Sequence, residues 1–162
     1  MTVSRTTRQT APIVGGSGVP RAASVGAARM AAVLFCILAA FHVALVLGAP
    51  WGKYTQGGGT SGTLATSGRI VAGGSFVLAM VMAGAILSRV GQGPLRRLPA
   101  RVTTVLTWLM TAYAVVGVIL NLITRSTAER AVWAPVSIVL LVLIAFVMVT
   151  THRRRRPRGA GR

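Results

Sequence analysis

The sequence predicts an all-α membrane protein, a four-transmembrane-helix bundle with both the N and C termini cytoplasmic. Hydrophobic residues make up 53% of the 162-residue chain and charged residues only 12%, about half the charged fraction of a typical soluble domain. Charges are absent from four long stretches and gather between them. The basic residues are also divided unevenly between the two sides that these stretches would define.

The four apolar stretches are the predicted spans, at about residues 31–48, 70–88, 102–123 and 132–150. Each is close to the ~20 residues that cross a hydrocarbon core ~30 Å thick. Inside lipid every backbone N–H and C=O needs a partner within the segment or in a closed barrel. These runs are too long and too uniformly apolar for barrel strands, so we expect helices. They make residues 28–151 one transmembrane domain.

The distribution of basic residues predicts the orientation. Fourteen of the 18 lie before the first span, between the second and third, or after the fourth, whereas Lys53, Arg69, Arg125 and Arg130 lie on the opposite side. The positive-inside rule makes the first group cytoplasmic. We therefore expect a multi-pass protein of the cytoplasmic (inner) membrane. The excess of Arg over Lys, with many Ala, Gly and Val residues, suggests a bacterial genome of high G+C content.

Both ends of the chain are predicted to be basic tails. Residues 1–27 are rich in Thr, Ser, Gly, Pro and Arg and have little to bury, which predicts disorder. The first span is longer than a signal-peptide core and lies far from the start, so we expect it to be retained, with cleavage near Gly48 as the alternative. The Arg-rich cytoplasmic tail at 152–162 has no aromatic residue to stack on bases. It therefore favours anionic headgroups of the lipid bilayer over nucleic acid.

The sequence offers little chemistry for catalysis. Glu129 is the only carboxylate side chain, which argues against paired-carboxylate catalysis. His42 and His152 have no Cys or Asp partners near them in the sequence, so no metal site is predicted. The glycine-rich stretch at 57–62 lacks the Lys-Ser/Thr ending of a phosphate-binding loop and is interpreted as flexible. We expect no catalytic residue and no cofactor. The protein is predicted not to be an enzyme.

His42 is the one polar group of note within a span. Polar residues inside membranes are functional candidates by default. A neutral imidazole that bonds another helix is the structural alternative, and we favour it.

The segment before the fourth span predicts a helix start and a polar patch. Ser126-x-x-Glu129 is a capping box, in which the serine caps the Glu129 amide and the carboxylate reaches back to the cap. Trp133 fits the interfacial aromatic belt. One hypothesis is a polar patch of six residues that all belong to the outer face: Trp51, Arg69, Asn121, Arg125, Glu129 and Trp133. Helix capping and interfacial anchoring alone would explain the same residues, and we favour that reading.

The same segments carry a resemblance. The motif Gly48-Ala49-Pro50-Trp51-Gly52 and the pattern N-x3-R-S-x2-E-R-x2-W-x-P over residues 121–135 resemble an uncharacterised family of small four-span bacterial integral membrane proteins. The resemblance covers about residues 30–150 and implies the four-span fold. It implies no activity, so no catalytic residue follows from it.

Two classes of function fit these observations. The first is a non-enzymatic accessory or scaffold component of the membrane, bound to a membrane-protein partner or to copies of itself. Ser75, Ala79 and Ala83 are small residues at four-residue spacing, which lets helices approach closely within one bundle or in a homo-oligomer. The alternative is an oligomeric small-solute transporter or channel, because four short helices alone rarely enclose a solute path.

Overall fold

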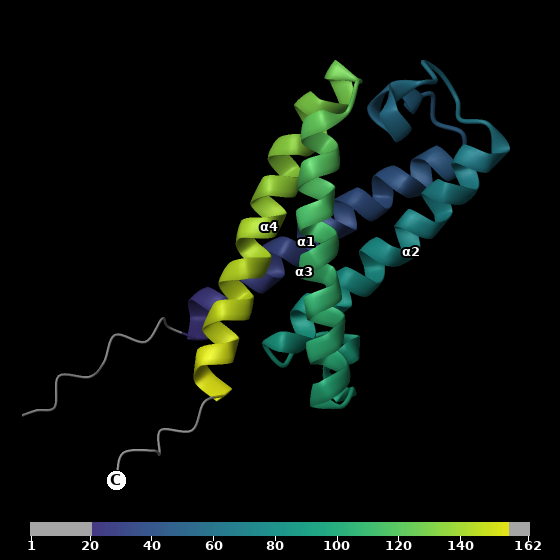
Figure 1. Cartoon of the computed structure of the whole chain (residues 1–162). Helices are drawn as coiled ribbons and strands as arrows, with labels where there is room; N and C mark the ends of the chain where they lie inside the picture. Colours follow the sequence, from purple (N-terminus) through teal and green to yellow (C-terminus); the bar gives the residue numbers. More distant parts are fainter. Residues whose placement is uncertain (1–20, 156–162) are drawn as a thin grey trace, which may run out of the picture.

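The computed structural model describes residues 21–155, with side chains through His152, and contains four long helices (Figure 1). They are α1 (Arg21–Val46), α2 (Thr66–Arg89), α3 (Ala100–Ile123) and α4 (Thr127–Arg155). Three short 3-10 segments lie between them: η1 (Gly52–Tyr54), η2 (Gln56–Gly58) and η3 (Pro94–Arg97). The predicted tails up to residue 20 and beyond residue 155 lie outside the described residues.

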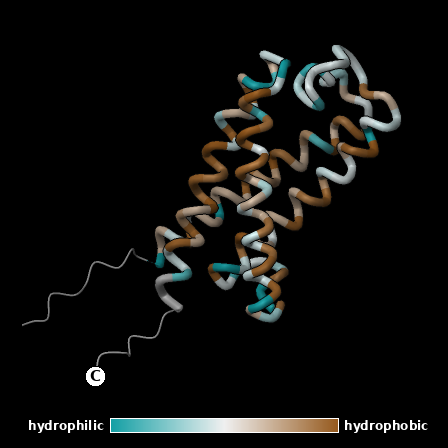
Figure 2. The backbone as a smooth tube through the Cα atoms, in the orientation of Figure 1, coloured by the Kyte–Doolittle hydropathy of each residue, from teal (hydrophilic) through white to brown (hydrophobic). Residues whose placement is uncertain are grey.

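Each of the four helices is long and apolar enough to cross a membrane. The shortest, α2 and α3, have 24 residues each, which is about 36 Å of helix against a hydrocarbon core of about 30 Å. Hydrophobic positions occupy the middle of the helices, and hydrophilic positions gather toward their ends (Figure 2). The predicted all-α, four-span fold is confirmed. By helix length and hydropathy, the chain is a multi-pass integral membrane protein.

The helices extend beyond the predicted apolar spans. α1 is helical from Arg21, so part of the predicted disordered tail at 1–27 is ordered. Ser24 and Ala28 are buried, and Ser24 Oγ donates a hydrogen bond to Thr150 Oγ1 on α4 at 3.1 Å. Contacts with α4 therefore stabilise a helical turn that composition alone assigns to the tail.

Small residues let the first two helices pack closely. α1 contacts mainly α2 and α4, while α3 contacts α4 and, less extensively, α2. Ala79 and Ala83 of α2 are buried in the main apolar cluster, as their spacing predicts, together with four alanines of α1: Ala28, Ala31, Ala32 and Ala39. Ser75 is only half-buried, and its hydroxyl bonds the Val71 carbonyl within the same helix.

The two ends of the bundle differ in construction. We call residues 46–66 and 121–133 the loop end, because it carries the long α1–α2 loop and the α3–α4 turn (Figure 1). Residues 21–29, 84–104 and 147–152 form the opposite end, the arginine end. There Arg89 of α2 donates hydrogen bonds to Thr104 of α3 at 3.2 Å and to Thr151 of α4 at 3.1 Å. The arginine end is thus closed by direct contacts between helices.

Candidate functional site

The α1–α2 loop is docked onto the start of α4 by three hydrogen bonds. Trp133 Nε1 donates to the Tyr54 carbonyl at 2.7 Å, and Ser126 Oγ donates to the Lys53 carbonyl at 2.7 Å. The Gly57 N–H donates to Glu129 Oε2 at 2.9 Å. Their partners are 72 to 79 residues apart in the sequence. The interpretation of this loop as a flexible glycine stretch is therefore wrong for the part that carries Gly57 and Gly58.

Both glycines are needed for their geometry. Gly57 has φ +79° and Gly58 has φ +69°, a left-handed conformation that side chains with a Cβ adopt at a cost. A Cβ on Gly58 would lie 2.5 Å from Ser126 Cβ, which is closer than real atoms approach. The glycines therefore let the loop lie directly against the cap of α4.

The predicted capping box is half correct. Ser126 Oγ accepts a hydrogen bond from the Glu129 amide at 3.2 Å, so Ser126 is the N-cap. The Glu129 carboxylate does not return to the Ser126 amide. Its Oε2 accepts from Gly57 N and, at 2.9 Å, from Thr124 Oγ1. The carboxylate joins the α1–α2 loop to the α3–α4 turn, because both donors reach it from outside α4.

An aromatic cluster lies beneath the docked loop. The Phe41 ring of α1 stacks on Trp51, with centroids 5.9 Å apart, and meets the edge of Trp133, with centroids 4.7 Å apart. Trp51 is exposed, whereas Trp133 is half-buried. Because the Trp133 N–H bonds a loop carbonyl, this tryptophan anchors the loop as well as lying near a helix end.

Four of the six predicted patch residues, all but Arg69 and Arg125, are connected around one cavity. Glu129, Trp133 and Asn121 lie around one cavity, and Trp51 is connected to them through Phe41.

Arg69 lies at the opposite edge of the loop, where Nε donates to the Val46 carbonyl at 2.7 Å and Nη2 donates to the same oxygen. Arg125 is exposed and makes no hydrogen bond or ion pair within the part of the chain described. A common binding patch of all six stays a prediction.

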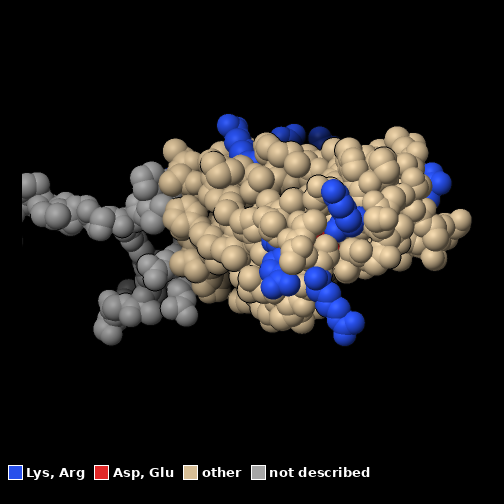
Figure 3. Space-filling view, turned by 90° about the horizontal axis from the view of Figure 1, so that it is seen from above, with Lys and Arg blue, Asp and Glu red and all other residues tan. Residues whose placement is uncertain are grey.

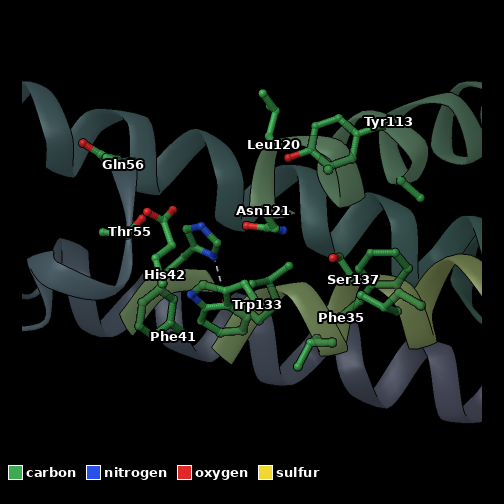
Figure 4. Close-up of a pocket in the computed structure, with 16 residues that line it drawn as sticks. Phe35, Phe41, His42, Thr55, Gln56, Tyr113, Leu120, Asn121, Trp133 and Ser137 are labelled. Atoms are coloured by element: carbon green, nitrogen blue, oxygen red, sulfur yellow. Dashed lines mark hydrogen bonds between the residues drawn. The ribbon is translucent and has the colours of Figure 1, made fainter. Parts of the chain in front are cut away.

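A cavity of about 380 Å³ lies below the loop, between α1, α3 and α4 (Figure 4). Thr55 and Gln56 of the loop, together with Glu129, line the part of the cavity nearest the loop. Its wall is largely aromatic, with Phe35 and Phe41 from α1, Tyr113 from α3 and Trp133 from α4. The volume is within the range of pockets that take drug-sized molecules.

Two polar side chains inside the cavity, His42 and Asn121, offer acceptors to a ligand. His42 Nδ1 lies 2.8 Å from the Leu38 carbonyl of its own helix. A carbonyl only accepts, so Nδ1 carries the hydrogen and the neutral ring offers Nε2 as an acceptor. The favoured bond from His42 to another helix is therefore wrong, since the bond stays within α1. Asn121 points into the same space (Figure 4) and makes no hydrogen bond among the described residues.

The cavity does not continue to the arginine end. Phe35 and Leu140 line its deepest part. One turn closer to the arginine end, Met110, Ile144 and Val147 are buried at 2% exposure or less. The cavity is therefore a pocket beneath the loop, not a path through the bundle.

Sequence reasoning missed most of the cavity wall. Phe35, Phe41 and Tyr113 belong to spans that are apolar on every side, so no periodicity separates lipid-facing from cavity-facing positions. His42, Asn121, Glu129 and Trp133 carried the usable signal, as polar or aromatic residues in or near a span. In the described part of the chain, no group of three His, Cys, Asp or Glu residues could hold a metal ion.

The basic residues of the loop end are not gathered over the cavity. Seen from above, lysine and arginine side chains project separately from the surface (Figure 3). Lys53 Nζ lies over the Tyr54 ring, 4.9 Å from its centroid, and Arg130 Nη2 donates to the Thr124 carbonyl at 2.9 Å.

Comparisons of the chain with family models, curated proteins and solved structures found no match. The family resemblance of the two motifs accordingly stays a prediction.

Proposed function

We propose that this protein is a non-enzymatic accessory or scaffold component of the cytoplasmic membrane, and that its loop end is its specific binding surface. The docked loop is the observation that supports the proposal. Hydrogen bonds from Ser126, Gly57 and Trp133 hold it in one conformation. A surface ordered before binding loses less conformational entropy when a partner binds.

A role without catalysis agrees with the hydrogen bonds of Glu129, the only carboxylate side chain of the sequence. Glu129 already accepts two hydrogen bonds that hold the loop. We propose that the arginine end is cytoplasmic by the positive-inside rule, so that the loop end faces outward. The motifs at the loop end are also the part that resembles the small four-span bacterial family, and membership in that family belongs to this proposal.

The alternative is an oligomeric transporter or channel for a small solute, which the cavity favours. Met110, Ile144 and Val147 close the bundle below the cavity. Passage through one chain would require these three side chains to move. The alternative therefore needs either a large rearrangement or a path between copies.

Site-specific photocrosslinking in native membranes tests the proposal. A benzoylphenylalanine residue is placed at exposed Thr127 of the loop end, at exposed Val139 in the middle of α4, or at exposed Leu98 of the arginine end. The proposal predicts one discrete adduct with a different protein from Thr127, and none from Val139.

The Trp133→Phe variant is a matched control, because it keeps the ring and removes the donor to Tyr54. It should weaken the Thr127 adduct by loosening the loop. An adduct with a second copy of this chain would leave the alternative open. The absence of any Thr127 adduct would contradict an accessory role for this surface.

A further inference from the structure

The only acid of the chain lines the cavity without a basic partner. The protein carries 18 basic residues against this single carboxylate. Glu129 nevertheless forms no ion pair within the described chain. Of the basic residues at the loop end, Lys53 lies over Tyr54, Arg69 bonds Val46 and Arg130 bonds Thr124. Among the described residues, no positively charged side chain is thus paired with this carboxylate beside the cavity.

The other polar groups in the cavity add acceptors. His42 presents Nε2 as an acceptor because Nδ1 is used within α1. Asn121 presents an amide oxygen as an acceptor beside its N–H donors, and its side chain is directed toward the same space as His42 (Figure 4). A ligand with a positive charge or N–H donors would satisfy these groups. An anionic headgroup would meet a carboxylate in the same space.

The walls fit the apolar part of such a ligand. Phe41, Trp133 and Tyr113 come from three different helices and surround the cavity. The faces of aromatic rings attract cations, most strongly where water is excluded. Toward Phe35 and Leu140 the cavity becomes apolar. It therefore offers a polar, acceptor-rich region near the loop and a hydrophobic region deeper in the bundle.

We infer that the cavity binds a lipophilic organic cation, with its positive charge near Glu129 and its apolar groups between the aromatic rings of α1, α3 and α4. The inference rests on the proposed function, since it makes the loop end the binding end. It adds the chemistry of a ligand. The docked loop covers this ligand, and Glu129 serves both to hold the loop and to balance the ligand charge.

A pair of probes with equal size and opposite charge tests the inference. Tetraphenylphosphonium and tetraphenylborate have nearly the same size and shape but opposite charges, and because the dipole potential of the bilayer affects them differently, the partition of each into lipid is measured separately. The purified full-length chain in lipid nanodiscs is titrated with each probe, and binding is measured against empty nanodiscs. We expect saturable binding of the phosphonium and no saturable binding of the borate.

Glu129→Gln is the central variant, because the amide keeps the oxygen that accepts from Gly57 and Thr124 but lacks the charge. It should lower the affinity for tetraphenylphosphonium by about tenfold or more. Arg130→Gln is the control, since it changes the net charge of the same end at a residue outside the cavity lining. It should not lower the affinity.

A gain-of-function variant keeps the test independent of any folding defect in Glu129→Gln. Asn121→Asp adds a second carboxylate to the cavity from α3 and should raise the phosphonium affinity several-fold in the otherwise unchanged chain. In the Glu129→Gln chain it should restore binding. Equal binding of the two probes, or unchanged phosphonium affinity in both Glu129→Gln and Asn121→Asp, would overturn the inference.

These outcomes are separable from those of the proposed function. Crosslinking from Thr127 uses no cation and reports a protein partner. A persistent Thr127 adduct with no charge preference between the probes would refute the ligand chemistry alone. Phosphonium binding without a Thr127 adduct would support the cavity as a ligand site and remove the case for a protein partner at this surface.

Discussion

The two ends of the bundle bring the same four helices together by different means. At the arginine end, side chains bond directly across helices: Ser24 with Thr150, and Arg89 with Thr104 and Thr151. At the loop end, the connection between α1 and α4 is made mainly by loop backbone, through the carbonyls of Lys53 and Tyr54 and the amide of Gly57. Each end also holds a cavity, of about 380 Å³ beneath the loop and of about 440 Å³ at the arginine end, where Ser24, Arg89 and Thr151 line it.

The difference explains why the loop end needs polar side chains on α4. A loop brings backbone donors and acceptors to the edge of the membrane domain, and each needs a partner. Ser126, Glu129 and Trp133 supply those partners from α4. The cavity beneath the loop therefore lies next to backbone groups that side chains of α4 hold in place. Four variants or sets of variants would break or sharpen this comparison.

The largest expected effect concerns which end faces outward. Cys36 is the only cysteine and is exposed, so it is first replaced by Ala. Single cysteines are then placed at exposed Ser61 and Thr127 of the loop end and at exposed Ala100 of the arginine end. An impermeant maleimide should label the first two in intact cells and Ala100 only after permeabilisation. Labelling of Ala100 from outside would reverse the orientation that the positive-inside rule predicts.

Breaking the loop dock should have the next largest effect. Gly58→Ala places a Cβ 2.5 Å from Ser126 at a residue with φ +69°, so the loop must move. We expect a loss of about 2 kcal/mol or more of stability, measured as a lower midpoint of thermal unfolding in detergent. Gly59→Ala is the matched control, because φ is −65° there and no atom lies within 4 Å of the added Cβ. Equal losses in the two variants would show that the loop is not docked.

An equivalent change at the arginine end tests its close packing. A Cβ on Gly84 would lie 3.0 Å from Leu95 Cδ1, so Gly84→Val should overpack the contact between α2 and η3. We expect a loss of about 1–3 kcal/mol. Gly74→Val carries the same change in helix propensity at a position with open space. Thermal unfolding of the two proteins isolates the packing contribution. A loss no greater than that of Gly74→Val would contradict tight packing at this end.

The smallest expected effect is that of Glu129→Gln on stability. The amide oxygen of Gln can accept from Gly57 and Thr124, so the midpoint of unfolding should stay within the error of the measurement. Glu129→Ala removes the acceptor for both donors and should cost about 1–3 kcal/mol, as expected when polar groups lose a partner. Equal and severe losses in both variants would mean that the charge itself, through a pairing such as that with Arg125, stabilises the fold.

The four spans were predictable because a lipid environment restricts the structures that an apolar segment can form. A charge-free run of about 20 residues in a small chain has few structural options when every backbone group must be satisfied internally. Ser126 as a helix cap was predictable for a similar reason, since its partner amide is three residues away. The ends of α1 and α4 extended further than hydropathy indicated, because side-chain bonds such as Ser24 with Thr150 act beyond the apolar core.

The candidate site was predictable only in outline. Asn121, Glu129 and Trp133 stood out as polar or aromatic residues near a span. Their common cavity depends on contacts such as Gly57 with Glu129, which lie 72 residues apart, and a local pattern carries no information about such pairs. The glycine run looked like a linker because flexibility and a forced left-handed turn require the same residue.

The docked loop also imposes an order on assembly. The ribosome synthesises the loop residues Lys53, Tyr54 and Gly57 more than 70 residues before their hydrogen-bond partners on α4 and its cap, Ser126, Glu129 and Trp133. During synthesis, α1 and α2 can pair through their alanines as soon as both are made. The α1–α2 loop cannot dock until the start of α4 has been synthesised, and until then its backbone groups bond to water. Completion of the cavity therefore reports that the last helix has been inserted, and chains truncated before residue 126 should have the first two spans without a covered site.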